Sequence, residues 1–133
     1  MGDLLTEKSE KTLDKLGMII SGVCVIHCLL TPIIVLALPW VEGIFSHEVV
    51  HLSLLLFLFP LAIFTFTHGY KTHKKLSIVI MGAIGISFIS IPILIHPAEF
   101  TEQALTISGS IILIIAHYNN LKSCKCHNTT TKM

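Results

Sequence analysis

Charged side chains are scarce in this chain. Asp, Glu, Lys and Arg make up 13% of its 133 residues, against roughly 25% in an average soluble domain. Hydrophobic residues make up 53%, and the mean hydropathy is +0.80. A small soluble domain leaves much of its surface in water and cannot hide this much apolar material. The composition therefore excludes an ordinary soluble domain and predicts an integral membrane protein.

Other absences exclude whole classes of function. The net charge is only +1, so the chain has no basic field suited to nucleic acid. It has no phosphate-binding loop of the G-x-x-x-x-G-K-[ST] type, which argues against an ATP-driven pump. No cleavable signal peptide precedes the four cysteines, so we do not expect a secreted disulfide framework. Because no nucleophile–base constellation stands out, we expect no enzyme.

Four runs contain no Asp, Glu, Lys or Arg, and each reaches the ~20 residues that a helix needs to cross a bilayer. They predict transmembrane helices at about 16–38, 49–69, 76–96 and 103–120, because backbone amides in lipid must be satisfied within the protein. The short connections favour an all-α, up-and-down bundle. The chain then divides into an N-terminal segment (1–15), a membrane domain (16–121) and a tail (122–133).

The lysines predict the orientation of the bundle. Positive charges collect on the cytoplasmic side of membrane proteins. All nine lie before the first run, between the second and third, or after the fourth: Lys8, Lys11, Lys15, Lys71, Lys74, Lys75, Lys122, Lys125 and Lys132. Both termini and the middle loop are therefore predicted to be cytoplasmic.

Two thiols and an imidazole interrupt the first apolar run. Residues at i, i+3 and i+4 share one face of a helix, so Cys24, His27 and Cys28 should form a cluster. At ~1.5 Å per residue it lies near the middle of the membrane. Pro32 has no N–H for the Cys28 carbonyl, so we expect a kink there and a free oxygen beside the second thiol.

This cluster predicts a metal site. Cysteine can also act as a small packing residue, but ionisable groups inside membranes are rare and usually functional. Thiols at i, i+4 on one helix suit a disulfide poorly. Soft thiolates select Cu(I), Zn(II) and, by the same logic, Hg(II). We therefore predict Cys24, Cys28 and His27 as metal ligands.

The first span also carries a resemblance. It reads Asp14-x-x-Gly17-x-x-x-Ser21-x-x-Cys24-x-x-His27-Cys28-Leu29-x-x-Pro32. This line, the four-span layout and the later His117-Tyr118-Asn119-Asn120 closely resemble the MerC family of inner-membrane mercuric-ion transport proteins. The resemblance implies a multi-pass protein of the bacterial inner membrane. It also implies that Cys24 and Cys28 carry Hg(II), and that Cys124 and Cys126 match a cytoplasmic pair.

Further cysteines and histidines offer weaker sites. A C-x-C pair such as Cys124 and Cys126 can present two sulfurs to one ion, although cysteines in a juxtamembrane tail can also be incidental or palmitoylated. His68 and His117, at the inner ends of spans two and four, have no role that the pattern assigns.

His47-Glu48-x-x-His51 fits the H-E-x-x-H pattern of zinc proteases. The short outer loops offer His96 and Glu99 as third ligands but no substrate cleft. A weak metal-collecting site at the outer face is a better use for these residues than a protease.

The leading hypothesis is therefore a transporter that relays Hg(II) through paired cysteines to cytosolic thiols or a metal-accepting protein. The bilayer and the metal ion are the expected partners, and the sequence does not set an oligomeric state. Zinc or copper transport by the same thiols is the alternative; zinc prefers four ligands and would need His27 and a residue from another helix. A thiol redox or assembly protein of the membrane is a third hypothesis.

Overall fold

The fold is a bundle of four helices. The computed structural model describes residues 2–41 and 47–131, without the side chains of 2–4, 6, 35, 41–48 and 127–131. The helices are α1 (Gly2–Ala37), α2 (His47–His73), α3 (Leu76–Ile95) and α4 (Glu99–Thr131), with a 3-10 turn, η1 (Pro39–Val41), after α1. The described residues contain no strand. The predicted all-α class with four long apolar helices is confirmed.

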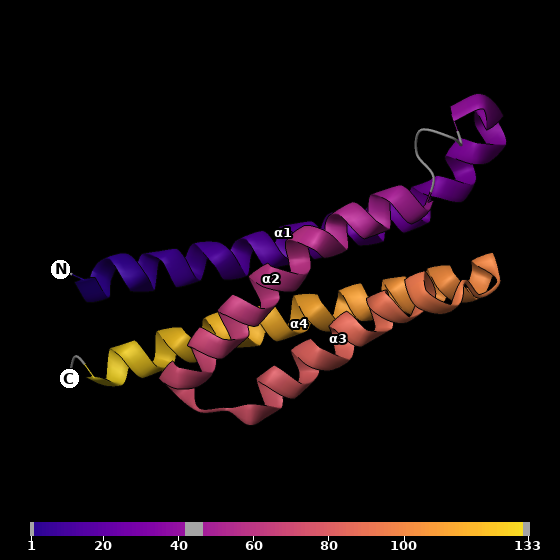
Figure 1. The fold of residues 1–133 in the computed structure, drawn as a ribbon. Helices are drawn as coiled ribbons and strands as arrows, with labels where there is room; N and C mark the ends of the chain where they lie inside the picture. Colours follow the sequence, from indigo (N-terminus) through magenta and orange to yellow (C-terminus); the bar gives the residue numbers. More distant parts are fainter. Residues whose placement is uncertain (1, 42–46, 132–133) are drawn as a thin grey trace.

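The helices run up and down along one axis (Figure 1). Both ends of the chain lie at the same end of the bundle, which we call the terminal end; the opposite end is the far end. α4 lies between α1 and α3 and packs extensively against both. Residues near the start of α1 therefore meet residues near the end of α4, although they are about a hundred positions apart in the sequence.

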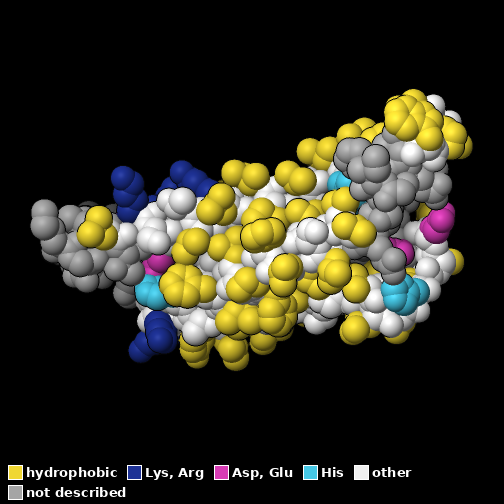
Figure 2. All heavy atoms as spheres, turned by 45° about the horizontal axis from the view of Figure 1, so that its top comes forward, with side chains coloured by type: hydrophobic (Ala, Val, Ile, Leu, Met, Phe, Trp, Pro, Cys, Tyr) yellow, Lys and Arg dark blue, Asp and Glu magenta, His cyan; other side chains and the backbone are white. Residues whose placement is uncertain are grey.

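Each helix contains a stretch that is long and apolar enough to cross a membrane: Glu7–Ile34, Val49–His73, Leu76–Ile95 and Glu99–Cys126. Only 22% to 44% of the residues in the most apolar windows are buried inside the bundle. Figure 2 shows hydrophobic side chains over the middle of the visible face and lysines at the terminal end. A soluble protein would not expose so much contiguous apolar surface, and the chain is a membrane protein.

The interior has an apolar part and a polar part. Buried apolar side chains come from α2, α3 and α4: Leu58, Ala62, Phe66, Ile78, Ile89, Leu113 and Ala116. Helices α3 and α4 approach closely at two glycines, since a Cβ on Gly109 would lie 2.8 Å from the Gly85 oxygen. This agrees with the small residues that the sequence places in those two runs.

The polar part of the interior lies between α1 and α4. The buried positions of α1 are spaced alternately by four and three residues: Glu10, Asp14, Gly17, Ser21, Cys24 and Cys28. Six of the buried positions of α4 follow the same spacing: Thr106, Ser110, Leu113, His117, Asn120 and Cys124. This spacing keeps one face of each helix toward its neighbour. We call this interface the α1–α4 seam.

Helices α1 and α4 extend beyond the apolar runs from which the sequence predicts them. α1 begins at Gly2 and α4 continues to Thr131, so the helical backbone includes most of the segments 1–15 and 122–133. A hydrophobic run marks only the part of a helix that lipid can contact. Intrahelical hydrogen bonds continue past that boundary, because polar residues such as Glu, Lys and Gln are also good helix formers.

Candidate metal centre

Cys24, Cys28 and His51 form the one group of three or more His, Cys, Asp or Glu residues in the described part of the chain whose metal-binding atoms lie close together. Their sulfur and nitrogen ligand atoms all lie within 4.8 Å of one another. The exposed fractions of the three residues are 3%, 0% and 1%. Cys28 Sγ lies 3.1 Å from His51 Nε2. The thiols come from α1 and the imidazole from α2, so helix packing completes a two-sulfur, one-nitrogen set suited to a soft or borderline metal ion.

A carboxylate from α4 stands behind the imidazole. His51 Nδ1 lies 3.8 Å from Glu102 Oε1, while Nε2 faces the Cys28 sulfur. A carboxylate near one ring nitrogen is the arrangement that commonly orients a metal-binding histidine. Glu102 is only partly buried and belongs to the first turn of α4. It therefore lies between the buried site and the far end of the bundle.

The backbone beside the second thiol is also held from α4. Pro32 lies inside α1 and has no N–H for the Cys28 carbonyl. The Gln103 side-chain amide donates a hydrogen bond to that carbonyl oxygen instead. Figure 1 shows the last turns of α1 bending away from the line of the helix, as the proline predicts. The oxygen expected beside Cys28 is thus used to join α1 to α4.

The thiol pair lies closer to the far end than its place in the apolar run predicts. Cys28 is six residues before Ile34, where the candidate span of α1 ends, and Cys24 is ten residues before it. The span predicted from the sequence begins at Leu16, whereas the stretch of α1 whose length and composition would let it cross a membrane begins at Glu7. His51, two residues into its own span, lies at the same level because α1 and α2 run in opposite directions.

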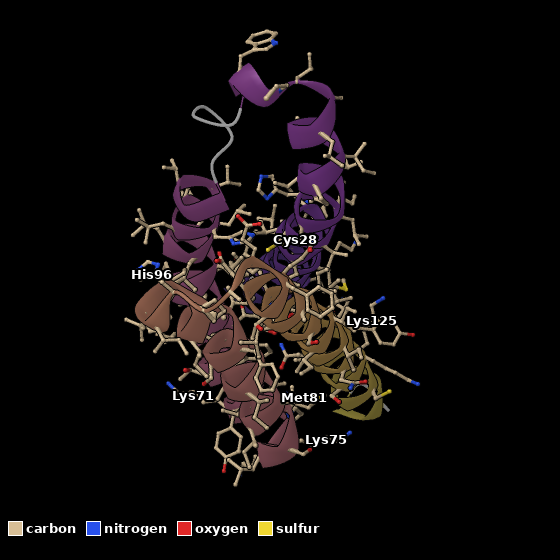
Figure 3. All side chains as sticks on the ribbon, turned by 90° about the vertical axis from the view of Figure 1, so that its right-hand side faces the viewer. Cys28, Lys71, Lys75, Met81, His96 and Lys125 are labelled. Carbon is tan, nitrogen blue, oxygen red and sulfur yellow. The ribbon has the colours of Figure 1, made fainter. Side chains whose placement is uncertain are left out.

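His27, the imidazole predicted to join the thiols, is half-buried beside them. Its ring meets the His51 ring edge-on, with 5.5 Å between the ring centroids. The close three-atom group uses His51 and omits His27. Figure 3 shows Cys28 inside the bundle, where the helices meet.

The structure does not bring the two tail cysteines together. Both lie on α4, and residues two apart on a helix point about 200° away from each other. Cys124 is buried, with 2% of its surface exposed, and Cys126 is exposed. Unwinding of the helix would be needed before both sulfurs could hold one ion.

The H-E-x-x-H segment does not present its last histidine outward. His51 points into the bundle, and the side chains of His47 and Glu48 lie outside the described residues. His96 and Glu99, considered as further outer ligands, are exposed. Figure 3 shows His96 at the outside of the bundle, away from Cys28.

Sequence reasoning missed the contribution of His51, Glu102 and Gln103 to the thiol site. Each is a polar residue at the far-end start of an apolar run. In an antiparallel bundle such residues meet the last turns of the preceding helix, which here hold Cys28. These contacts could have been predicted from the sequence by comparing the depths at which polar residues lie in neighbouring spans.

A family model described as MerC mercury resistance protein matches residues 14–122. The chain belongs to the MerC family. No curated protein and no solved structure matches it. The match includes Cys24, Cys28 and His51 and ends before Cys124 and Cys126.

Membership makes the chain a mercury-resistance membrane protein of the transporter type. The MerC match and the thiol site fall on the same helices. In this chain, two sulfurs and one imidazole lie buried among helices that could cross a membrane.

Proposed function

We propose that this MerC-family protein carries Hg(II) across the bacterial inner membrane by way of Cys24 and Cys28. The observation that carries the proposal is the burial of both thiols against His51 within a lipid-exposed bundle. Thiolates offer the soft ligands that Hg(II) requires. An intramembrane site built from such groups has a functional role by default.

Transfer of the ion proceeds by thiol exchange. Hg(II) enters from the far end, which the lysine distribution assigns to the periplasm, and replaces the protons of Cys24 and Cys28. Since sulfur ligands are exchanged one at a time, the ion is never free in the bilayer. It leaves to cytosolic thiols or a metal-accepting protein. Stronger thiol binding inside drives transfer, together with the membrane potential, worth ~2.3 kcal/mol per charge per 100 mV.

The tail cysteines enter the route separately. Cys126 is the exposed member of the pair and offers an optional stopping point for the ion at the terminal end, which direct transfer to cytosolic thiols bypasses. Buried Cys124 follows only if the end of α4 unwinds.

Zinc or copper transport is a second candidate, favoured by the imidazole in the site. A nitrogen beside two sulfurs, with a carboxylate behind it, is a ligand set that zinc accepts. Zinc then needs a fourth ligand that the three residues do not supply. A thiol redox or assembly role uses the same cysteines, which are both in the free thiol form, and predicts no dependence on metal.

The test is metal content in bacteria that express the chain. Wild type, Cys24→Ser/Cys28→Ser and the control Cys126→Ser are exposed in parallel to mercury, zinc and copper. Excess mercury in the wild type and in Cys126→Ser, but not in the double variant, supports the proposal. If zinc or copper shows this pattern in place of mercury, the result supports the second candidate, transport of that metal. Equal content in all three strains overturns metal transport.

A further inference from the structure

A partly open cavity lies at the terminal end of the bundle, between the start of α3 and the end of α4. Its volume is about 350 Å³, within the roughly 300–1,000 Å³ of sites that bind small molecules. The side chains that line it include positive charges, hydroxyls and sulfur atoms: Lys75, Ser77, Met81, Lys122, Ser123 and Cys126. The metal centre at the other end of the bundle uses none of these residues.

The way α3 and α4 pack leaves this space. They approach most closely where a Cβ on Gly109 would lie 2.8 Å from the Gly85 oxygen. Figure 1 shows the two helices side by side toward the far end and apart toward the terminal end. The cavity residues of α4 are spaced i, i+3, i+4 and i+7, so they share one face of the helix: Asn119, Lys122, Ser123 and Cys126. This face is turned away from the α1–α4 seam.

The cavity carries positive charge. Lys75 Nζ donates a hydrogen bond to Ser123 Oγ of α4 at 3.2 Å, so one ammonium group is held across the space between the two helices. Lys122 supplies a second ammonium group. No Asp or Glu is among the described residues that line the cavity, and the buried Asp14 carboxylate lies in the seam, where it meets His117. A concave surface with charge of one sign attracts ligands of the opposite sign, here an anion.

The same cavity carries sulfur. The exposed thiol of Cys126 and the thioether of Met81 both line it. Hg(II) bound to a cysteine leaves most readily to another sulfur, because soft thiolates are the ligands that this ion selects. A space of this size admits a small molecule and excludes a folded protein domain. The lining therefore suits a ligand that has both an anionic group and a sulfur atom.

We propose that this cavity binds a small acidic thiol, a molecule with one thiol and at least one carboxylate, which takes Hg(II) from Cys126. The carboxylate meets Lys75 and Lys122, and the thiol lies against the Cys126 sulfur. A bond forms between mercury and the incoming sulfur, the bond from mercury to Cys126 breaks, and the proton of the incoming thiol passes to the Cys126 sulfur. Mercury keeps its second ligand, and nothing is oxidised or reduced.

This inference rests on the proposed transport of Hg(II) and adds the chemical class of one acceptor. Direct transfer to other cytosolic thiols continues beside it. Loss of the cavity therefore slows one route of release and does not abolish the accumulation of mercury.

A full-length chain that keeps Cys126 as its one cysteine isolates the step. This Cys24→Ser/Cys28→Ser/Cys124→Ser variant is loaded in detergent with one Hg(II) per chain, and the release of mercury is followed after a thiol is added. Mercaptosuccinate, which carries two carboxylates, is compared with 2-mercaptoethanol, which carries none. Each rate is measured over a range of thiol concentrations.

Two pairs of lysine substitutions are made in this background. Lys75→Gln/Lys122→Gln removes the charges of the cavity and keeps most of each side chain. Lys71→Gln/Lys125→Gln is the matched control, because it removes two exposed lysines of the same end that do not line the cavity. Dividing the rate in each variant by the rate in the parent chain, for the same thiol, cancels the intrinsic reactivity of that thiol.

The rate with mercaptosuccinate should level off at high concentration, as binding to a site requires. Below saturation it should fall about tenfold in Lys75→Gln/Lys122→Gln, since two exposed charge pairs together contribute on the order of tenfold. The control pair should change it by less than about twofold, because salt screens charges that are not in contact with the ligand. Release to 2-mercaptoethanol should be the same in all three chains.

A second measurement uses the wild-type chain and does not depend on the folding of the single-cysteine variant. Succinate carries two carboxylates and no thiol, so it should occupy the cavity without taking mercury. It should slow the labelling of exposed Cys126 by a neutral maleimide in a saturable way; the other three cysteines are buried. This protection should disappear in Lys75→Gln/Lys122→Gln and persist in Lys71→Gln/Lys125→Gln.

Equal behaviour of the two lysine pairs, in release to mercaptosuccinate or in protection by succinate, overturns the acidic-thiol site. The protection is also measured in nanodiscs of phosphatidylcholine, with and without phosphatidylglycerol. If the anionic lipid abolishes it, the cavity holds a lipid headgroup, and the proposal is likewise overturned. Failure of the transport proposal has a different signature: the mercury content of cells would not depend on Cys24 and Cys28, whatever the cavity binds.

Discussion

Cys28 is held by two neighbouring helices at once. Its sulfur lies 3.1 Å from His51 Nε2 of α2, and its carbonyl oxygen accepts a hydrogen bond from Gln103 of α4. The second contact exists because Pro32 removes the usual helical donor. At the residue scale, the thiol is therefore fixed in position by groups that are distant in the sequence, and His51 is the one that also offers a ligand atom.

Replacing His51 tests that assignment. His51→Ala is expected to weaken the binding of Hg(II) to the purified protein by at least about tenfold, because even a group that only orients a metal ligand contributes roughly ten- to a hundred-fold. Removing it also leaves Cys28 without the nitrogen that faces its sulfur. Competition titration against a thiol chelator measures the affinity.

His27→Ala is the matched comparison, since His27 is next to Cys28 in the sequence but outside the close three-atom group. We expect it to lose less affinity than His51→Ala. A larger loss of Hg(II) affinity in His27→Ala than in His51→Ala would indicate that His27 is the ligand, as the sequence spacing predicts.

At the scale of elements, the helices pair in two different ways. α1 meets α4 through polar and small residues, among them Asp14, Ser21 and His117. α3 meets α4 through glycines, at a distance that leaves no room for a side chain. In lipid, close backbone approach and interhelical hydrogen bonds replace the hydrophobic effect as the force between helices.

The glycine contact gives a prediction for stability. Gly109→Ala is expected to lower the free energy of unfolding by about 1–3 kcal/mol, as overpacking does. Its Cβ would lie 2.8 Å from the Gly85 backbone oxygen, which cannot move without moving α3. Unfolding in mixed detergent micelles, followed by circular dichroism, measures the change.

Gly22→Ala is the control for helix propensity, which improves by up to about 1 kcal/mol in any glycine-to-alanine change. Apart from the neighbouring residues and backbone of its own helix, no heavy atom lies within 4 Å of the Cβ position at Gly22. Its stability should be equal to wild type or higher. Equal stability of the two variants would contradict the close contact between α3 and α4.

The whole molecule is polarised from end to end. Both termini lie at one end of the bundle, and lysines gather there (Figures 1 and 2). Glu102 and Gln103 lie at the start of α4, at the far end. The thiols lie in the half of the bundle nearer the far end, while Asp14 and His117 lie toward the terminal end. The metal-binding group and the buried Asp14–His117 pair thus lie at different levels along the bundle.

Labelling of Cys126 tests which side the terminal end faces. The positive-inside rule predicts the cytoplasm, so a membrane-impermeant maleimide should label exposed Cys126 in inverted vesicles and not in intact spheroplasts. A variant that keeps Cys126 as its one cysteine makes the signal specific.

A variant that keeps only Cys124, which is buried, serves as the unlabelled control. Labelling of Cys126 in spheroplasts would reverse the orientation and, with it, the direction of transport.

The sequence by itself determined the class of protein, the four spans and the thiol pair. Lipid imposes a one-dimensional rule, about 20 apolar residues in helical conformation, which a sequence displays directly. Cys24 and Cys28 were found for a similar reason, because i, i+4 spacing on a single helix needs no partner to be interpreted.

Tertiary structure decided which groups meet from different helices. The choice of His51 over His27, the bond from Gln103 to the Cys28 carbonyl and the pairing of Asp14 with His117 all depend on the level and rotation of packed helices. Hydrophobic runs do not specify either quantity. Both follow from where small residues allow close approach and where buried polar groups find partners.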